Sequence, residues 1–446
     1  MGVNAMQMPK LNVVMTSVIA AAILLLGVIN DANAVPSFAR QTNLECTSCH
    51  LSWLELTPTG RQFKLNGYTL GERQPIPLAG MLQASITKTN HVDNNVPDAF
   101  KHDKDVKLQQ VSLFLSTKYT DHIGSFIQWT YDGVEHHSSI DNADIRFADR
   151  IGDKDHSLIY GITLNNNPTV QDVYNTVPVW GFPYASSSVA IAPNASTMLE
   201  GGLSQQVAGL GAYFSWNKTI YGELSAYHTA DKIFSPLKAG IKDTDAAKID
   251  GLNPYWRLAL QHEWNAGTNS AMIGTYGMTV DKYPDNLNPH GPTDRFKDIA
   301  FDAQYQYITD EHRASAQINW IHEKQEWNAS FPGGSTSNSS DTLKSFHAKA
   351  TYYYQMKYGI NVGYFSIRGG ADPALYPADE VTGSATGSPN TSGYIVDLNY
   401  LPKRDVRLVL QYTGYTKFNG AKQNYDGFGR DASDNNSIYA LLWMMF

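Results

Sequence analysis

The residues best suited to chemistry are Cys46, Cys49 and His50, which form a C-x-x-C-H motif with the only two cysteines of the chain. This spacing lets two thiols form thioether bonds to the vinyl groups of one haem, while the adjacent histidine presents a ring nitrogen to the iron. The alternative is a structural disulfide or a thioredoxin-like dithiol, but a redox dithiol normally lies in a βαβ setting and none surrounds this motif. The motif therefore predicts one covalent haem c with His50 as an axial iron ligand.

The segment that must hold this haem, residues 35–79, is too short for a self-sufficient apolar core. A covalent haem would supply the missing apolar surface. Thr57 and Pro58 followed by Gly67 predict a helix with an N-cap, an N1 proline and a C′ glycine. Arg61 and Lys64 lie on that helix, where they would either neutralise haem propionates or form a solvated face. We expect a small monohaem cytochrome c domain, mostly helical or irregular.

The second axial ligand of the haem iron is predicted to be Met81. Between residues 51 and 90 there is no second histidine, and Met81 is the only methionine. A thioether opposite a histidine raises the reduction potential of a haem. The alternative is that Met81 simply begins the first strand, and that the ligand is water or a side chain from far along the chain.

The first 34 residues predict an export signal. Lys10 supplies the charge, residues 13–29 are almost entirely apolar, and Ala32-Asn33-Ala34 is an A-x-A cleavage site. The alternative is an uncleaved membrane anchor. Export brings the protein to an oxidising compartment, which is also where haem c is attached.

The composition of the chain excludes several classes of protein. Charged residues make up 17% of the chain, below the roughly 25% of soluble proteins. Beyond residue 34 no run approaches the roughly 20 apolar residues of a transmembrane helix. The 34 basic residues against 42 acidic ones give a net charge of −8, so no basic footprint for nucleic acid exists. These numbers exclude a helical membrane protein, a disordered chain and a nucleic-acid-binding protein.

From Met81 onward the chain alternates with period 2. The last strand presents one apolar face that ends on an aromatic residue: Ile438, Ala440, Leu442, Met444 and Phe446. Opposite faces of other strands are polar, as at Asp302, Gln304 and Gln306. Apolar-out and polar-in alternation is typical of strands with lipid on one side and a wet lumen on the other. The alternative is a soluble sandwich or propeller, which would leave the Tyr and Trp residues at strand ends unexplained.

Sixteen antiparallel strands are predicted within residues 80–446, at 81–88, 106–119, 125–132, 142–149, 157–164, 207–216, 219–229, 254–264, 270–280, 297–309, 312–325, 342–355, 357–367, 392–400, 406–415 and 436–446. The connections alternate between long and short, as in outer-membrane barrels with extracellular loops and short periplasmic turns. This pattern places both chain ends, and hence the haem segment, on the periplasmic side or inside the barrel lumen.

One outer loop, residues 165–206, stands apart from the others. Its first half is dense in prolines and aromatic residues, which predicts an ordered loop. An ordered loop of this length would fold into the lumen and narrow it. The alternative is an exposed loop with chance aromatics.

The whole mature chain resembles the fused monohaem cytochrome–porins, the outer-membrane iron-oxidase cytochromes of Fe(II)-oxidising bacteria. Beyond the haem motif and the barrel, the resemblance rests on Asn165–Tyr184 and on Pro36, Phe38-Ala39-Arg40-Gln41-Thr42, Pro58, Gly60-Arg61, Phe63-Lys64-Leu65 and Gly67-Tyr68. It implies an Fe(II):cytochrome c oxidoreductase. Such a protein takes electrons from extracellular Fe(II) and delivers them, through one haem, to a periplasmic c-type cytochrome or other soluble carrier.

Two alternatives share the same architecture. One is an outer-membrane conduit for another extracellular donor or acceptor, and the other is a solute porin whose haem segment serves as a plug or sensor. An occluding loop 165–206 favours a conduit, whereas an open lumen favours a porin.

The acidic residues of the first outer loop, such as Asp93 and Asp103 beside His91 and His102, would either attract Fe(II) or form an ordinary solvated loop face.

Overall fold

The computed structural model describes residues 36–153 and 156–446. The predicted export signal, residues 1–34, lies outside these described residues. Within them, no helix combines the length and the apolar character needed to cross a membrane.

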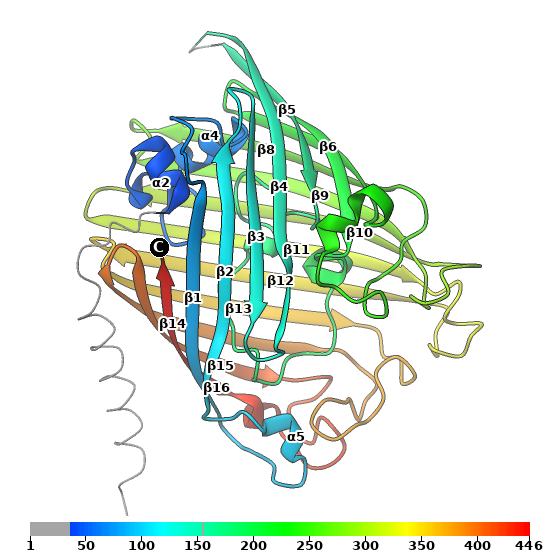
Figure 1. Cartoon of the computed structure of the whole chain (residues 1–446). Coiled ribbons are helices and arrows are strands. Elements are labelled where there is room, and N and C mark those ends of the chain that lie inside the picture. The colour runs from blue at the N-terminus through cyan, green and yellow to red at the C-terminus, as the bar shows by residue number, and fades with distance from the viewer. Residues whose placement is uncertain (1–35, 154–155) are drawn as a thin grey trace, which may run out of the picture.

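Sixteen strands form one closed barrel in which every strand pairs antiparallel with its sequence neighbours and β1 pairs with β16 (Figure 1). The strands are β1 (Leu78–Thr89), β2 (Val106–Lys118), β3 (Ile123–Asp132), β4 (His137–Gly152), β5 (Ser157–Asn165), β6 (Val207–Trp216), β7 (Ile220–Thr229), β8 (Asn253–Trp264), β9 (Asn269–Lys282), β10 (Asp294–Ile308), β11 (His312–Glu326), β12 (Ser340–Tyr354), β13 (Tyr358–Gly369), β14 (Thr391–Lys403), β15 (Val406–Lys417) and β16 (Ser437–Met445). The predicted number of strands and their order are confirmed.

The two faces of the wall differ as the period-2 pattern predicts. Exposed apolar side chains cover the outer face, among them Ile162, Leu224, Leu258, Ile273, Ile318, Leu398 and Leu410. Exposed aromatic residues gather at strand ends beside the short turns: Trp216, Trp264, Tyr307, Tyr354, Tyr358 and Tyr400. An apolar outer band bordered by an aromatic girdle around a closed barrel is the architecture of bacterial outer-membrane proteins. The protein is therefore an outer-membrane β-barrel.

The connections follow the predicted alternation with one exception. Short turns such as 217–219, 309–311 and 355–357 lie at one end, and long loops such as 166–206, 327–339 and 370–390 lie at the other. The exception is the connection 133–136, because β4 begins at His137 rather than at residue 142. A register shift at Gln128/Trp129 interrupts the alternation there, and this bulge concealed the first part of β4 from the sequence pattern.

The segment before the barrel is helical, as predicted, and lies at the end of the barrel that carries the short turns. It contains α2 (Ser37–Thr42), α3 (Cys46–Cys49) and α4 (Pro58–Leu65). In Figure 1, α2 and α4 lie near the C-terminal end of the chain, whereas α5 (Pro97–Phe100) lies in a long loop at the opposite end. Strand β1 begins at Leu78, so the barrel wall starts two residues before the predicted boundary at residue 80.

Candidate cofactor site in the barrel lumen

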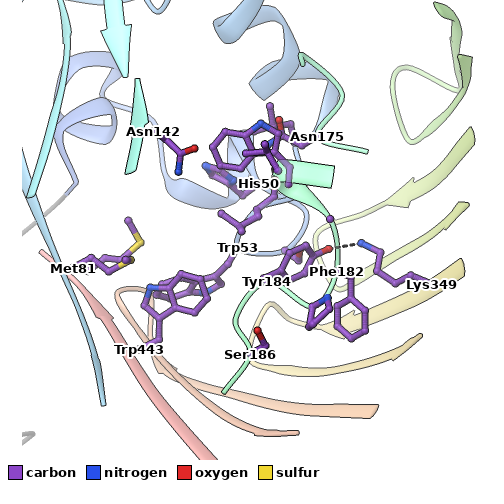
Figure 2. A pocket seen from close by; sticks show the side chains of 18 of the residues that line it. His50, Trp53, Met81, Asn142, Asn175, Phe182, Tyr184, Ser186, Lys349 and Trp443 are labelled. Atoms are coloured by element: carbon purple, nitrogen blue, oxygen red, sulfur yellow. Dashed lines mark hydrogen bonds between the residues drawn. The ribbon is translucent and has the colours of Figure 1, made fainter. Parts of the chain in front are cut away.

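The C-x-x-C-H motif lines a large cavity inside the barrel. Cys46, Cys49 and His50 contribute to a cavity of about 1360 Å³, together with side chains from several walls (Figure 2). Small-molecule sites typically enclose about 300–1,000 Å³, so this cavity has room for a group as large as a haem. The cavity reaches from residues of the short turns, such as Asp310 and Arg404, to the lumen loop, residues 166–206, at Ala190 and Ser204.

The chemistry of the motif fits covalent haem. Both thiols are free rather than joined in a disulfide. Burial raises the pKa of Cys49 to about 11 and lowers that of His50 to about 4, so the imidazole is neutral, which is the form that coordinates metals. His50 Nδ1 is buried without a hydrogen-bond partner, and such an orphaned polar atom is costly unless something completes the site.

Helix α4 packs directly on the motif. Thr57 caps it by accepting a hydrogen bond from Gly60 N at 3.3 Å, and Pro58 occupies its first turn, as predicted. Gly60 allows the close approach of the two helices, because a Cβ there would clash with the carbonyl oxygen of Cys49. The helix ends at Leu65, Asn66 is its C-cap, and Gly67 follows with a φ of +66°. The N-cap, N1 and C′ predictions are confirmed.

The expectation of a solvated face at Arg61 and Lys64 is wrong, because both side chains point into the barrel and are 2% and 5% exposed. Arg61 donates to Gln306 at 2.8 Å, and Lys64 donates to the carbonyl of Val170 at 2.8 Å. The polar face of α4 suggests exposure to solvent when the helix is considered alone. The barrel wall encloses this face, and the local sequence carries no sign of that.

Two cations in this cavity have no carboxylate partner. Lys64 and Arg313 line the cavity, and neither belongs to an ion pair in the described part of the chain. Arg313 instead donates to the carbonyls of Thr47 and His50, at 2.6 and 2.9 Å, and burial lowers the pKa of Lys64 to about 7. Unpaired buried cations are costly, and haem propionates are anions that would compensate them. The residues present therefore fit the group that the motif predicts.

Glu55 fixes the haem-motif segment to the barrel wall. Its carboxylate is fully buried and forms an ion pair with Lys349 of β12 at 2.5 Å. It also accepts hydrogen bonds from Ser315 at 2.6 Å and from Tyr184 of the lumen loop at 2.7 Å. Figure 2 shows Tyr184 hydrogen-bonded to Lys349. One carboxylate thus joins the segment, the loop and two strands.

The lumen loop folds into the barrel, as the sequence predicts. Asp172 pairs with Arg257 of β8 at 2.9 Å, and Thr176 is hydrogen-bonded to Asp302 of β10. Asn175 donates to the carbonyl of Leu54 at 2.8 Å. The loop therefore crosses the lumen from β5 to β8 and β10 and packs on the haem-motif segment.

The cavity brings together Met81, which the sequence analysis proposed as an iron ligand, and two residues that sequence reasoning did not single out. Met81 lines it and is 4% exposed, on the inward face of β1. Met445 of β16 is the register partner of Met81 and also lines the cavity, as does His347 of β12. Only barrel closure brings Met445 beside Met81, so no local signal could have identified it. Met81 as the iron ligand remains a prediction, now with Met445 as a neighbouring candidate.

The first outer loop offers no assembled metal site. His102 and Asp105 lie 3.4 Å apart, and Lys104 pairs with Asp103 at 3.4 Å. Across residues 36–153 and 156–446, no group of three or more His, Cys, Asp and Glu side chains is arranged to hold a metal ion.

No protein-family model and no curated protein matches this chain. Similar solved structures include Salmonella typhi OmpF in complex with daunomycin, which is 13% identical, with 83% of this chain and 97% of that chain covered and a TM-score of 0.46. The outer membrane channel DcaP of Acinetobacter baumannii is 12% identical, with 83% and 96% covered and a TM-score of 0.47. An anion-selective porin from Comamonas acidovorans is 11% identical, with 83% and 98% covered and a TM-score of 0.44. The barrel assignment rests on the strand pairing of this chain itself.

Proposed function

We propose that this outer-membrane barrel transfers electrons from extracellular Fe(II) to a periplasmic c-type cytochrome. The observation that carries the proposal is the C-x-x-C-H motif on the wall of a lumen cavity. The choice of Fe(II) as the electron donor rests on the resemblance to the cytochrome–porin family.

The residues have distinct roles in this proposal. Cys46 and Cys49 would hold the haem by thioether bonds, His50 would supply an axial nitrogen, and Lys64 and Arg313 would compensate the propionates. When bound, the haem supplies a one-electron redox centre. The lumen loop and Glu55 keep the segment inside the barrel, so the redox centre stays between the two sides of the membrane. Fe(III) is nearly insoluble near neutral pH, so oxidation outside the cell keeps the solid product out of the periplasm.

The proposal is tested with the purified, haem-loaded full chain under anaerobic conditions. Fe(II) should reduce the oxidised haem stoichiometrically, as seen in its α-band, and a periplasmic-type cytochrome c should reoxidise it. A Cys46→Ala/Cys49→Ala protein is the control and should give no signal. A haem that stays oxidised with excess Fe(II) at every pH tested would remove iron oxidation from consideration.

A solute porin is the second candidate, and the large lumen cavity favours it. The cavity reaches from the short turns to residues of the lumen loop, so a small solute that enters from the short-turn end would find room beside the haem motif. Planar-bilayer recordings separate the two functions. A porin should show solute-dependent conductance with the haem in place, whereas an electron conduit should show haem reduction by Fe(II) without such conductance.

A further inference from the structure

Two carboxyl groups face each other inside the barrel. Asp298 of β10 and Glu323 of β11 are directly opposite in the strand register, and they are 3% and 0% exposed. Like charges in directly opposite positions on neighbouring strands repel each other. Neither side chain belongs to an ion pair among the described residues.

The four carboxyl oxygens of this pair accept hydrogen bonds from only three donors among the described residues. Glu323 accepts from Met198 N at 2.6 Å and from Gln325 Nε2 at 2.8 Å. Asp298 Oδ2 accepts from Leu199 N at 3.0 Å. Asp298 Oδ1 is buried without a hydrogen-bond partner, and the residue opposite Asp298 in the strand register is Glu323. The fourth carboxylate oxygen therefore lacks a hydrogen-bond donor, and two buried carboxyl groups held opposite each other cannot both ionise without large cost.

The structure assigns a bound proton to this pair, carried by Asp298 and donated to Glu323. A proton fits better than a metal ion, because neither Asp298 nor Glu323 lines the large lumen cavity that contains the C-x-x-C-H motif. The described residues also contain no group of three or more acidic, His or Cys side chains placed to hold a metal. The site needs no haem and is independent of the proposed electron transfer.

The charged and titratable groups nearby do not supply the missing hydrogen atom. Glu200 of the lumen loop is paired with His347 of β12 at 2.9 Å. Lys282 of β9 and Tyr376 of a long loop interact electrostatically with Glu323, but the hydrogen bonds that the pair accepts among the described residues come from Met198, Leu199 and Gln325.

The shared proton joins the lumen loop to the wall. Met198 and Leu199 belong to that loop, and their backbone N–H groups donate to Glu323 and Asp298 respectively. A single proton between the carboxyl groups lets both accept these bonds without mutual repulsion. The site is thus a proton-dependent attachment point at the end of β10 that adjoins a long loop.

Infrared difference spectroscopy on the full-length folded protein at neutral pH tests the assignment. We expect the C=O stretch of a protonated carboxylic acid in the wild type, shifted in D₂O, and its loss in Asp298→Asn. Glu323→Gln should lose the same band, because its amide N–H replaces the shared proton. Asp281→Asn, at a carboxylate paired with Arg295 on the barrel surface, should keep the band.

Folding of each variant is judged by its heat-modifiable mobility on a gel. If only one of Asp298→Asn and Glu323→Gln folds, that variant alone tests the assignment. The assignment is wrong if the difference spectrum between wild type and a folded variant contains no protonated-carboxyl band. It is also wrong if metal analysis finds one equivalent of a cation in the wild type that both variants lose.

Discussion

Tyr184 of the lumen loop donates a 2.7 Å hydrogen bond to Glu55, five residues beyond His50 of the C-x-x-C-H motif. The bond joins two segments that lie far apart in sequence, deep inside a barrel that neither segment helps to form. Because Lys349 of the wall pairs with the same carboxylate at 2.5 Å, the position of the haem motif depends on the loop and on the wall together.

Replacing Glu55 should release the segment. Glu55→Ala leaves Lys349 buried without a counter-charge, and breaking such a pair typically costs about 3–5 kcal/mol. We expect urea to expose Trp53 at a lower concentration, measured by fluorescence. Glu45→Ala is the matched control: its pair with Arg404 is exposed and should be worth less than about 1 kcal/mol.

The same carboxylate gives a pH dependence. Burial opposes ionisation of Glu55, but the Lys349 ammonium and the bonds from Ser315 and Tyr184 hold its pKa below the ordinary 4.5. A lowered folded-state pKa means that its stabilisation is complete above pH 4.5 and is lost as pH falls through the folded value. The urea midpoint should therefore fall in acid in the wild type, and this part of the fall should be missing in Glu55→Gln.

Covalent haem attachment should depend on both cysteines. A Cys46→Ala/Cys49→Ala protein should show no haem staining on a denaturing gel, and His50→Ala should lose the native low-spin spectrum. Ser48→Ala, between the two cysteines, should keep both signals because serine supplies neither a thioether nor an iron ligand. Full staining of the double variant would refute the haem assignment.

The two methionines of the cavity can be distinguished by spectroscopy. If Met81 is the sixth ligand, Met81→Ala should lose the weak near-infrared Met-to-iron band of the oxidised haem, and its potential should fall. Met445→Ala should leave both unchanged. The reverse result would assign the ligand to Met445, and no change in either variant would point to another residue lining the cavity.

The lumen loop should close the pore through Arg257. This guanidinium is fully buried and pairs with Asp172 of the loop and with Asp302 of β10, at 2.9 and 2.7 Å. Arg257→Met leaves two buried carboxylates unpaired, so the loop should detach and single-channel conductance should rise. Arg295→Met, which breaks an exposed pair with Asp281, should conduct like the wild type.

The orientation of the barrel can be tested on intact cells. A tag inserted at Gly334, in the long connection 327–339, should bind antibody at the cell surface. A tag in the short turn at Asp310–Glu311 should bind antibody only after the outer membrane is permeabilised. Surface labelling of the second site would show that the barrel has the opposite orientation.

The sequence by itself determined the barrel and the haem motif. Alternation with period 2 is a local property, because successive side chains on a strand point to opposite faces, and it located all sixteen strands. It missed only the first part of β4, where a register shift opposite Gln128 and Trp129 of β3 interrupts the alternation. The C-x-x-C-H motif is also local, because five consecutive residues carry its chemistry.

Tertiary structure alone decided what surrounds that motif. Arg61 and Lys64 are buried because the barrel encloses α4, and Met445 lies beside Met81 because β16 closes on β1. Glu55 meets Lys349 across almost 300 residues of sequence, and Asp298 faces Glu323 because β10 pairs with β11 in one register. Such contacts depend on strand register and closure, which are set by pairing over the whole sheet and leave no signal in a short stretch of sequence.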